Sequence, residues 1–203
     1  MTTSAPRKTS GFTLTELLMV MTVVAILYCI SLSVIRAVSR SANKAAAQAE
    51  LKSIEIAFKQ YYSNYGDWPL TNSTDDASTE IDESMARILT GTETADYASN
   101  PEKMIFMEFA RSNKDGVPMN PWGANGRYKA GQCLYHVAFD TDGDNYVRFP
   151  SNDCSKWAAA DRLDSQQRAR AGVIVWTFNP EISPDYKGQN SDAKGNDYLI
   201  GSW

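Results

Sequence analysis

The feature that most constrains this chain is a run of 19 residues, Leu17 to Ile35, without a formally charged side chain. A helix of that length spans about 28 Å, close to the ~30 Å hydrocarbon layer of a bilayer. The mean hydropathy of the whole chain is nevertheless -0.39, which excludes a membrane protein with many spans. The sequence therefore predicts a single membrane helix joined to a larger part that is exposed to water.

The flanks of this run predict its orientation. Arg7 and Lys8 precede it, and cationic flanks stay on the cytoplasmic side, which leaves Arg36 onward outside. A cleaved secretory signal is disfavoured because the apolar run exceeds the usual 7 to 15 residues and residues 31–39 offer no A-x-A cleavage site. A plain signal anchor does not explain Glu16, because a carboxylate at the edge of an apolar helix is costly unless it is paired.

The residues Gly11-Phe12-Thr13-Leu14-Thr15-Glu16, followed by the apolar run, resemble the prepilin-peptidase motif of type IV pilins and type II secretion pseudopilins. The resemblance implies cleavage after Gly11 and N-methylation of Phe12. It also implies that Glu16, then the fifth residue, neutralises the Phe12 amino group of a neighbouring subunit during assembly. Many pilins have a proline within the membrane helix, whereas this chain has none between Phe12 and Pro69.

The helical pattern continues beyond the membrane. Apolar residues recur at alternating spacings of four and three, at Ala47, Leu51, Ile54, Phe58, Tyr61 and Tyr65. This spacing predicts one helix from Phe12 to about Tyr62, whose second half packs under a head domain. Lys44, Gln48, Lys52, Glu55 and Lys59 are expected on its other face.

The remaining sequence predicts a mixed head. A short helix is expected over residues 81–89, with Thr79 as a possible cap and Gly91 just past its end. Strands are expected within residues 127–139, 146–149 and 172–178. The predicted fold class is α+β and pilin-like, with a long N-terminal helix packed on a small antiparallel sheet. The expected segments are a leader (1–11), a transmembrane helix (12–35), the periplasmic part of the helix (36–66) and the head with its C-terminal loop (67–203).

Two groups of acidic residues are candidate calcium ligands. Asp140, Asp142 and Asp144 alternate around Gly143, and crowded oxygen ligands suit Ca²⁺. The group is not an EF-hand, because its glycine stands at the fourth position rather than the sixth. An acidic β-turn is the alternative. The second group follows from the resemblance, since major pseudopilins hold calcium in a C-terminal loop; it comprises Asp185, Asn190, Asp192, Asn196 and Asp197.

Cys133 and Cys154 are expected in an oxidising compartment, which favours a disulfide between them. Cys29, within the membrane run, is interpreted as a small apolar filler. His136 is the only histidine, and it lies opposite Tyr135 in the strand pattern. No metal cluster can be built around one histidine, and no catalytic motif with recognisable spacing is present, so the sequence predicts a protein that is not an enzyme.

The resemblance implies a structural pseudopilin in the bacterial inner membrane, with a cytoplasmic N-terminus and a periplasmic head. Its implied partners are further copies of the chain, other pseudopilins, the inner-membrane secretion platform and a prepilin peptidase. Removing Arg7 and Lys8 from the 20 basic residues leaves 18, against 24 acidic residues, a net charge of -6; nucleic acid is therefore not expected as a partner. The alternatives are a type IV pilus or DNA-uptake minor pilin, and a monotopic, signal-anchored, calcium-dependent binding domain.

Overall fold

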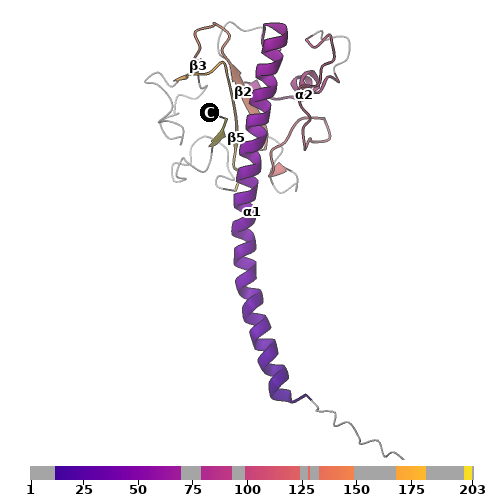
Figure 1. Ribbon diagram of the computed structural model, residues 1–203, viewed down its shortest axis with the longest axis vertical. Coiled ribbons are helices and arrows are strands. Elements are labelled where there is room, and N and C mark those ends of the chain that lie inside the picture. The colour runs from indigo at the N-terminus through magenta and orange to yellow at the C-terminus, as the bar shows by residue number, and fades with distance from the viewer. Residues whose placement is uncertain are drawn as a thin grey trace, which may run out of the picture. The chain divides into compact units, whose positions relative to one another are not determined.

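The computed structural model describes residues 12–69, 79–92, 99–123, 128, 133–148, 168–181 and 199–202. The chain divides into two compact units, Met1–Ala42 and Asn43–Trp203. Helix α1, Leu14–Tyr65, contributes to both units, and Figure 1 traces it in indigo to purple. The long helix predicted from the sequence is therefore present, and it begins two residues later and ends three residues later than expected.

The part of α1 in the second unit forms one wall of the main core. Its buried side chains are Ala47, Leu51, Ile54, Ala57, Phe58 and Tyr61. They pack against Tyr135, Val137 and Phe139, which alternate along one face of the sheet. The rings of Phe58 and Phe139 meet edge to face, with centroids 5.0 Å apart. The four-and-three spacing of the sequence thus identified the buried stripe correctly, apart from Tyr65, which is only half-buried.

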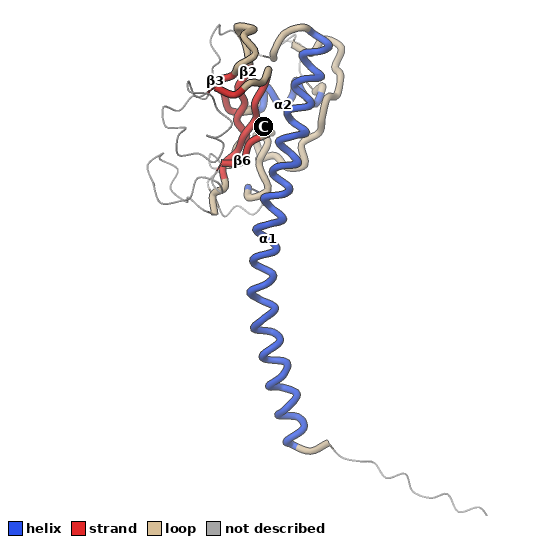
Figure 2. The backbone as a smooth tube through the Cα atoms, turned by 60° about the vertical axis from the view of Figure 1, so that its left-hand side comes forward, coloured by secondary structure: helices blue, strands red, loops and turns tan. Residues whose placement is uncertain are grey.

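The sheet beside α1 has four antiparallel strands in the order β1-β2-β5-β6. Their bounds are Thr79–Glu80, Tyr135–Phe139, Val173–Phe178 and Leu199–Gly201. The register of the central pair sets Val137 opposite Val175. Figure 2 shows the strands gathered beside the upper part of α1. This α+β arrangement, a long helix against an antiparallel sheet, is the predicted fold class.

The opposite face of the sheet is also buried. A second apolar cluster contains Ala138, Val147, Ala169, Ile174, Trp176 and Phe178. Two further strands, β3 (Val147–Arg148) and β4 (Arg168–Ala169), form a separate two-stranded sheet. The strand expected within residues 146–149 therefore exists, but it does not join the main sheet as predicted. All six residues of β5 are buried because the strand separates the two clusters.

Helix α2, Glu83–Thr90, lies on the other side of α1 from β2 and β5 in Figure 1. Its N-cap is Asp82, whose side chain accepts a hydrogen bond from the Met85 N–H at 2.8 Å. Thr79 is not the cap because it belongs to β1. At the other end of α2, Gly91 has a left-handed backbone conformation, and a Cβ atom at this position would lie too close to the Lys103 carbonyl oxygen. The predicted end of this helix at Gly91 is confirmed, whereas the predicted N-cap, Thr79, is wrong.

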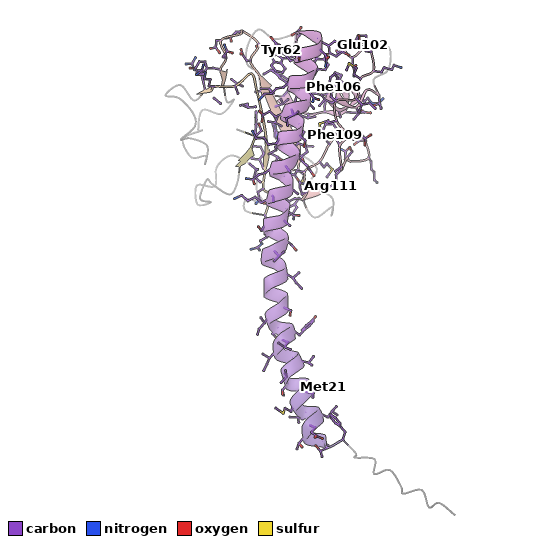
Figure 3. All side chains as sticks on the ribbon, in the orientation of Figure 1. Met21, Tyr62, Glu102, Phe106, Phe109 and Arg111 are labelled. Carbon is purple, nitrogen blue, oxygen red and sulfur yellow. The ribbon has the colours of Figure 1, made fainter. Side chains whose placement is uncertain are left out.

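Residues 99–111 run along α1 in the opposite direction. Tyr65 donates to the Asn100 Oδ1 at 2.8 Å, Tyr61 contacts Phe106 edge to face, and Arg111 pairs with Glu50. Figure 3 shows Phe106, Phe109 and Arg111 following one another down the helix. The segment has no regular secondary structure. It is fixed to the core by these side chains and by the backbone N–H groups of Phe106 and Met107, which donate to the Leu89 carbonyl at 2.9 and 3.3 Å.

Two buried asparagines hold the irregular segments to the head. The Asn100 side chain donates to the carbonyls of Ile88 and Met104 at 2.8 Å each. The Asn120 side chain donates to the Thr177 hydroxyl at 2.8 Å and accepts from the Trp122 N–H at 3.1 Å. Each amide therefore satisfies backbone groups that no strand pairing reaches.

Candidate functional site

The amino-terminal end of α1 holds the first candidate site. Thr13, immediately before the helix, donates its backbone N–H at 2.9 Å and its hydroxyl at 2.7 Å to the Glu16 carboxylate. The Glu16 N–H donates back to the Thr13 hydroxyl at 3.3 Å. This reciprocal pair is a capping box, and its Thr-x-x-Glu spacing is visible in the sequence although Thr13 was not singled out as a site residue. Glu16 is therefore held at the helix terminus within its own chain.

Phe12 adjoins this capping box. It is exposed and stands two residues before α1 begins. Gly11, the other residue of the predicted cleavage site, lies outside the described residues. The cleavage, the methylation of Phe12 and the pairing of Glu16 with a neighbouring amino group remain predictions. The geometry adds that Glu16 lies within hydrogen-bond distance of Thr13, the residue that follows the predicted new terminus.

The helix that follows is long and apolar enough to cross a membrane. Residues Leu14–Ser31 have a mean hydropathy of 2.1, and none of them is buried within the chain. Figure 3 shows the side chain of Met21 in this stretch with no other described element covering it. Thr22 and Ser31 donate their hydroxyls to the carbonyls of Met19 and Leu27 at 2.7 and 2.8 Å. Their polar groups are thereby satisfied inside the helix, as a lipid environment requires.

The acidic turn is the second candidate site. One carboxylate oxygen from each of Asp140, Asp142 and Asp144 lies within 4.8 Å of the others. Their oxygens also accept backbone hydrogen bonds at 2.7–3.1 Å, as when Asp140 binds the Gly143 and Asn145 N–H groups. The structure thus brings the three carboxylates together in a turn closed by its own hydrogen bonds, and calcium binding there remains a prediction.

A positively charged side chain, that of Arg168, lies beside the acidic turn. Arg168 lies 3.4 Å from an Asp144 carboxylate oxygen, and its guanidinium carbon is 4.4 Å from the centre of the Tyr146 ring. The carboxylates of the predicted C-terminal loop, Asp185, Asp192 and Asp197, lie outside the described residues, as does Asn196.

The cysteines differ in their surroundings. Cys29 is exposed on the membrane helix, and Cys133 is a buried free thiol. Burial raises the pKa of the Cys133 thiol to about 11, so an unbridged Cys133 is protonated at neutral pH. Cys154 lies outside the described residues, and the predicted disulfide remains a prediction.

His136 lies on the face of β2 that points away from α1, as its place in the strand pattern predicted. Its ring stacks on Trp176, with centroids 5.6 Å apart and an interplanar angle of 14°, and meets Phe178 edge to face. Desolvation by these apolar neighbours lowers the His136 pKa to about 4. The imidazole is therefore neutral over the physiological range and serves as a packing group.

Two carboxylates of α1, Glu50 and Glu55, lie in polar clusters. Glu50 accepts hydrogen bonds from Arg111 and from the Tyr135 hydroxyl. Burial, together with Glu50, raises the Tyr135 pKa far above its ordinary value. These groups line a cavity of about 90 Å³ beside α1. The partners are 61 and 85 residues apart, and no local pattern signals pairing over such separations.

Glu55 is the second carboxylate. It was expected on the outer face of the helix, yet it is only 8% exposed. Burial alone would raise the Glu55 pKa, but the hydrogen bonds from Lys59, Lys52 and Ser202 and the charge of Lys59 outweigh it and lower the pKa. Lys59 lies 2.6 Å and Lys52 3.0 Å from the carboxylate. The Glu55–Lys59 pair, which the i,i+4 spacing in the sequence favours, is therefore present, with the carboxylate buried and hydrogen-bonded to Ser202.

Comparison with known proteins identifies the amino-terminal site. Residues 6–27 match the family described as the prokaryotic N-terminal methylation motif. No curated protein and no solved structure matches the chain. The matched residues include the predicted cleavage site, the Thr13–Glu16 capping box and the first half of the apolar helix. This motif is typical of type IV pilins and pseudopilins and implies processing by a prepilin peptidase and polymerisation of the pilus type. The chain therefore carries the amino-terminal methylation motif that is typical of type IV pilin-like proteins, at the start of a helix long and apolar enough to anchor it in a membrane.

Proposed function

We propose that this protein is a structural pseudopilin, a subunit of the short periplasmic filament of a type II protein secretion system, and not an enzyme. The methylation motif at the start of an exposed apolar helix carries the proposal. In this proposal the precursor spans the inner membrane once, with its head in the periplasm. A prepilin peptidase removes residues 1–11, and the mature chains polymerise through α1.

The exposed surface of the first unit supports assembly through α1. The large apolar side chains that the structure describes at residues 14–30 and 35 are exposed, with values from 48% to 79%. In a filament these side chains would pack against the same segment of other copies. Contacts between helices would then replace their contacts with lipid. A charged amino group at Phe12 and the Glu16 carboxylate would neutralise each other there, whereas either charge alone is costly in an apolar layer.

The charge of the chain favours secretion over DNA uptake. Without residues 1–11 the chain has 18 Lys and Arg against 24 Asp and Glu. A surface that binds nucleic acid gains most of its affinity from cations placed against phosphates. A net charge of -6 opposes that contact, so a role in protein export is preferred to a role as a DNA-uptake pilin.

The proposal is tested by substituting Glu16 in the full chain, co-expressed with a prepilin peptidase and a secretion system. The mature wild-type chain should begin at methylated Phe12 by mass spectrometry, and it should form filaments that can be sheared from cells. Glu16→Ala should be inserted and cleaved but should yield no filaments. Glu83→Ala, which removes an exposed carboxylate from α2, is the matched control and should assemble normally.

Three results would overturn the proposal. An intact Met1 in cells that contain an active peptidase would indicate a simple signal anchor. Normal filaments from Glu16→Ala would show that assembly does not need the proposed pairing of Glu16 with the Phe12 amino group. Wild-type filaments that support DNA uptake but not protein export would place the chain in a pilus system instead.

A further inference from the structure

Residues 104–109 form an extended segment beside α1. They contain no turn, bend or positive φ. Phe106 contacts the Tyr61 ring, and Arg111 pairs with Glu50; the two helix positions are about 16.5 Å apart at 1.5 Å per residue. Between Phe106 and Arg111 the chain covers this distance at about 3.3 Å per residue, which is the rise of a β-strand. The segment therefore has the backbone of a strand, although it belongs to neither sheet.

The end of α2 lies at one edge of this segment, because the N–H groups of Phe106 and Met107 donate to the Leu89 carbonyl. Glu108 and Phe109 follow directly. Within the described part of the chain, the backbone N–H and C=O groups of these two residues have no hydrogen-bond partner. Successive residues of a strand direct these groups to opposite edges, so one of the two residues presents both groups on the α2 side. An unpaired strand edge is a template for pairing with another chain.

A groove of about 550 Å³ opens at this edge. One wall is α2, through Ala86 and Thr90, and the other is the segment, through Glu108 and Phe109. Phe109 lies on the α2 side of α1 in Figures 1 and 3. The unpaired backbone groups therefore face a space that no described element fills.

The charge of the groove is negative. Among the described residues that line it, Glu83 and Arg87 pair with each other, at 2.5 Å between an oxygen and a nitrogen. Glu108 is exposed and has no ion-pair partner in the described part of the chain. One uncompensated carboxylate therefore stands on the wall formed by the segment. Opposite charges on neighbouring strands attract each other, whereas like charges repel.

We propose that this groove binds an extended stretch of a partner polypeptide with basic side chains, which adds as a strand to the edge of residues 104–109. An extended partner is favoured over a helical one because only an extended backbone can pair with the free N–H and C=O groups. A basic partner is favoured because a Lys or Arg side chain beside Glu108 would neutralise its charge. This interaction of the head goes beyond the proposed role in filament assembly.

The experiment uses the full chain, reconstituted as single copies in phosphatidylcholine nanodiscs. The probe is a capped, fluorescein-labelled heptapeptide that alternates threonine and lysine, and its binding is followed by fluorescence anisotropy. The wild type should bind this peptide saturably. A version N-methylated at every residue keeps the charges but loses the backbone donors, and it should bind at least about tenfold more weakly. A version with glutamate in place of lysine should also bind more weakly.

Hydrogen exchange locates the bound peptide. Mass spectrometry should show that the lysine peptide slows the exchange of backbone N–H groups within residues 104–109. The N-methylated peptide should leave this exchange unchanged, because it cannot complete a strand ladder.

Matched variants isolate the charge. Glu108→Gln should weaken binding of the lysine peptide by about threefold, as expected for an exposed ion pair. Glu102→Gln makes the same charge change at an exposed residue that does not line the groove, and it should bind like the wild type. Circular dichroism and tryptophan fluorescence establish that both variants are folded.

The inference is overturned if the lysine peptide does not bind saturably, if the N-methylated peptide binds equally well, or if exchange within residues 104–109 does not slow. An unchanged affinity in Glu108→Gln, or an equal loss in Glu102→Gln, would also overturn it. Protection of the same residues that rises with the concentration of the chain in detergent, without peptide, would assign the groove to a second copy instead. The measurement needs a folded head but no filament, so it can fail while the proposed assembly stands.

Discussion

Acid should destabilise the head through His136. Its pKa is about 4 in the folded chain, because Trp176 and Phe178 exclude water from the ring, and the ordinary value is 6.5. As the pH falls below 6.5, His136 of the unfolded chain takes up a proton before His136 of the folded chain does. The contribution of the neutral imidazole to the free energy of unfolding is therefore complete above pH 6.5 and is lost as the pH falls toward 4. At about 1.4 kcal/mol per pH unit, the free energy of unfolding should fall by about 2 kcal/mol by pH 5 and about 3 kcal/mol by pH 4.

The assay is urea unfolding of the full chain in non-ionic detergent, followed by tryptophan fluorescence at pH 7, 5 and 4. Trp176, one of five tryptophans, stacks on His136, so part of the signal arises at the site of interest. The control is His136→Gln, which cannot be protonated in this range. Carboxylates contribute equally to both proteins, and the difference between the two pH profiles isolates the imidazole.

The variant should be less stable than the wild type at pH 7, because it loses the ring contacts, but its stability should depend less on pH. Parallel profiles for the two proteins from pH 7 to 4 would refute the reasoning. They would mean that the imidazole is hydrated or paired in the folded head. A wild type that becomes more stable at pH 5, relative to the variant, would show that the folded pKa is raised instead.

Further predictions concern the head. Asn120→Ala should lower the free energy of unfolding by about 2–4 kcal/mol, because it leaves buried groups of β5 and the Trp122 turn without partners; denaturant unfolding measures the loss. Phe58→Ala should cost about 3–5 kcal/mol by the same assay, since its fully buried ring packs on the sheet, and a loss below 1 kcal/mol would contradict this packing. Calorimetric titration with Ca²⁺ should give heat and a higher melting temperature that Asp140→Asn reduces, and their absence in the wild type would exclude the proposed sites. Non-reducing mass spectrometry of the protein from an oxidising compartment should find Cys133 joined to Cys154, and two free thiols there would exclude the bridge.

Local periodicity explains which elements could be predicted. The spacing of Leu51, Ile54 and Phe58 reports a helix face directly, and the alternation of Val137 and Phe139 reports a strand face. Both faces are buried as expected. Strands β1, β4 and β6 have only two or three residues, which is too short to carry a period, so the sequence pattern does not predict them. The cap of α2 was misplaced because Thr79 and Asp82 are both good capping residues, and only the backbone geometry chooses between them.

The candidate sites also differ in how far their residues are separated along the sequence, and this decides which of them could be predicted. The amino-terminal motif could be recognised because Gly11, Phe12 and Glu16 are close in sequence. The pairing of Glu50 with Arg111 could not, because it depends on how residues 99–111 run along α1. The acidic turn is intermediate: its sequence predicts crowded carboxylates, and the structure confirms that they meet.

The position of β5 and β6 in the chain has a consequence for the timing of export. The buried stripe of α1 ends at Tyr61, whereas β5 and Ile200 of β6, which complete the core against it, follow more than 100 residues later. Ser202, which follows β6, donates its N–H to the Val175 carbonyl of β5 at 2.9 Å. In the proposed export of the head, the helix therefore emerges with an uncovered apolar stripe, and the cover that begins with β2 is completed only by β5 and β6. Contacts this distant in sequence form slowly. During that interval a chaperone or the membrane surface would have to shield the stripe, and a subunit would become competent for assembly only after its final residues have crossed.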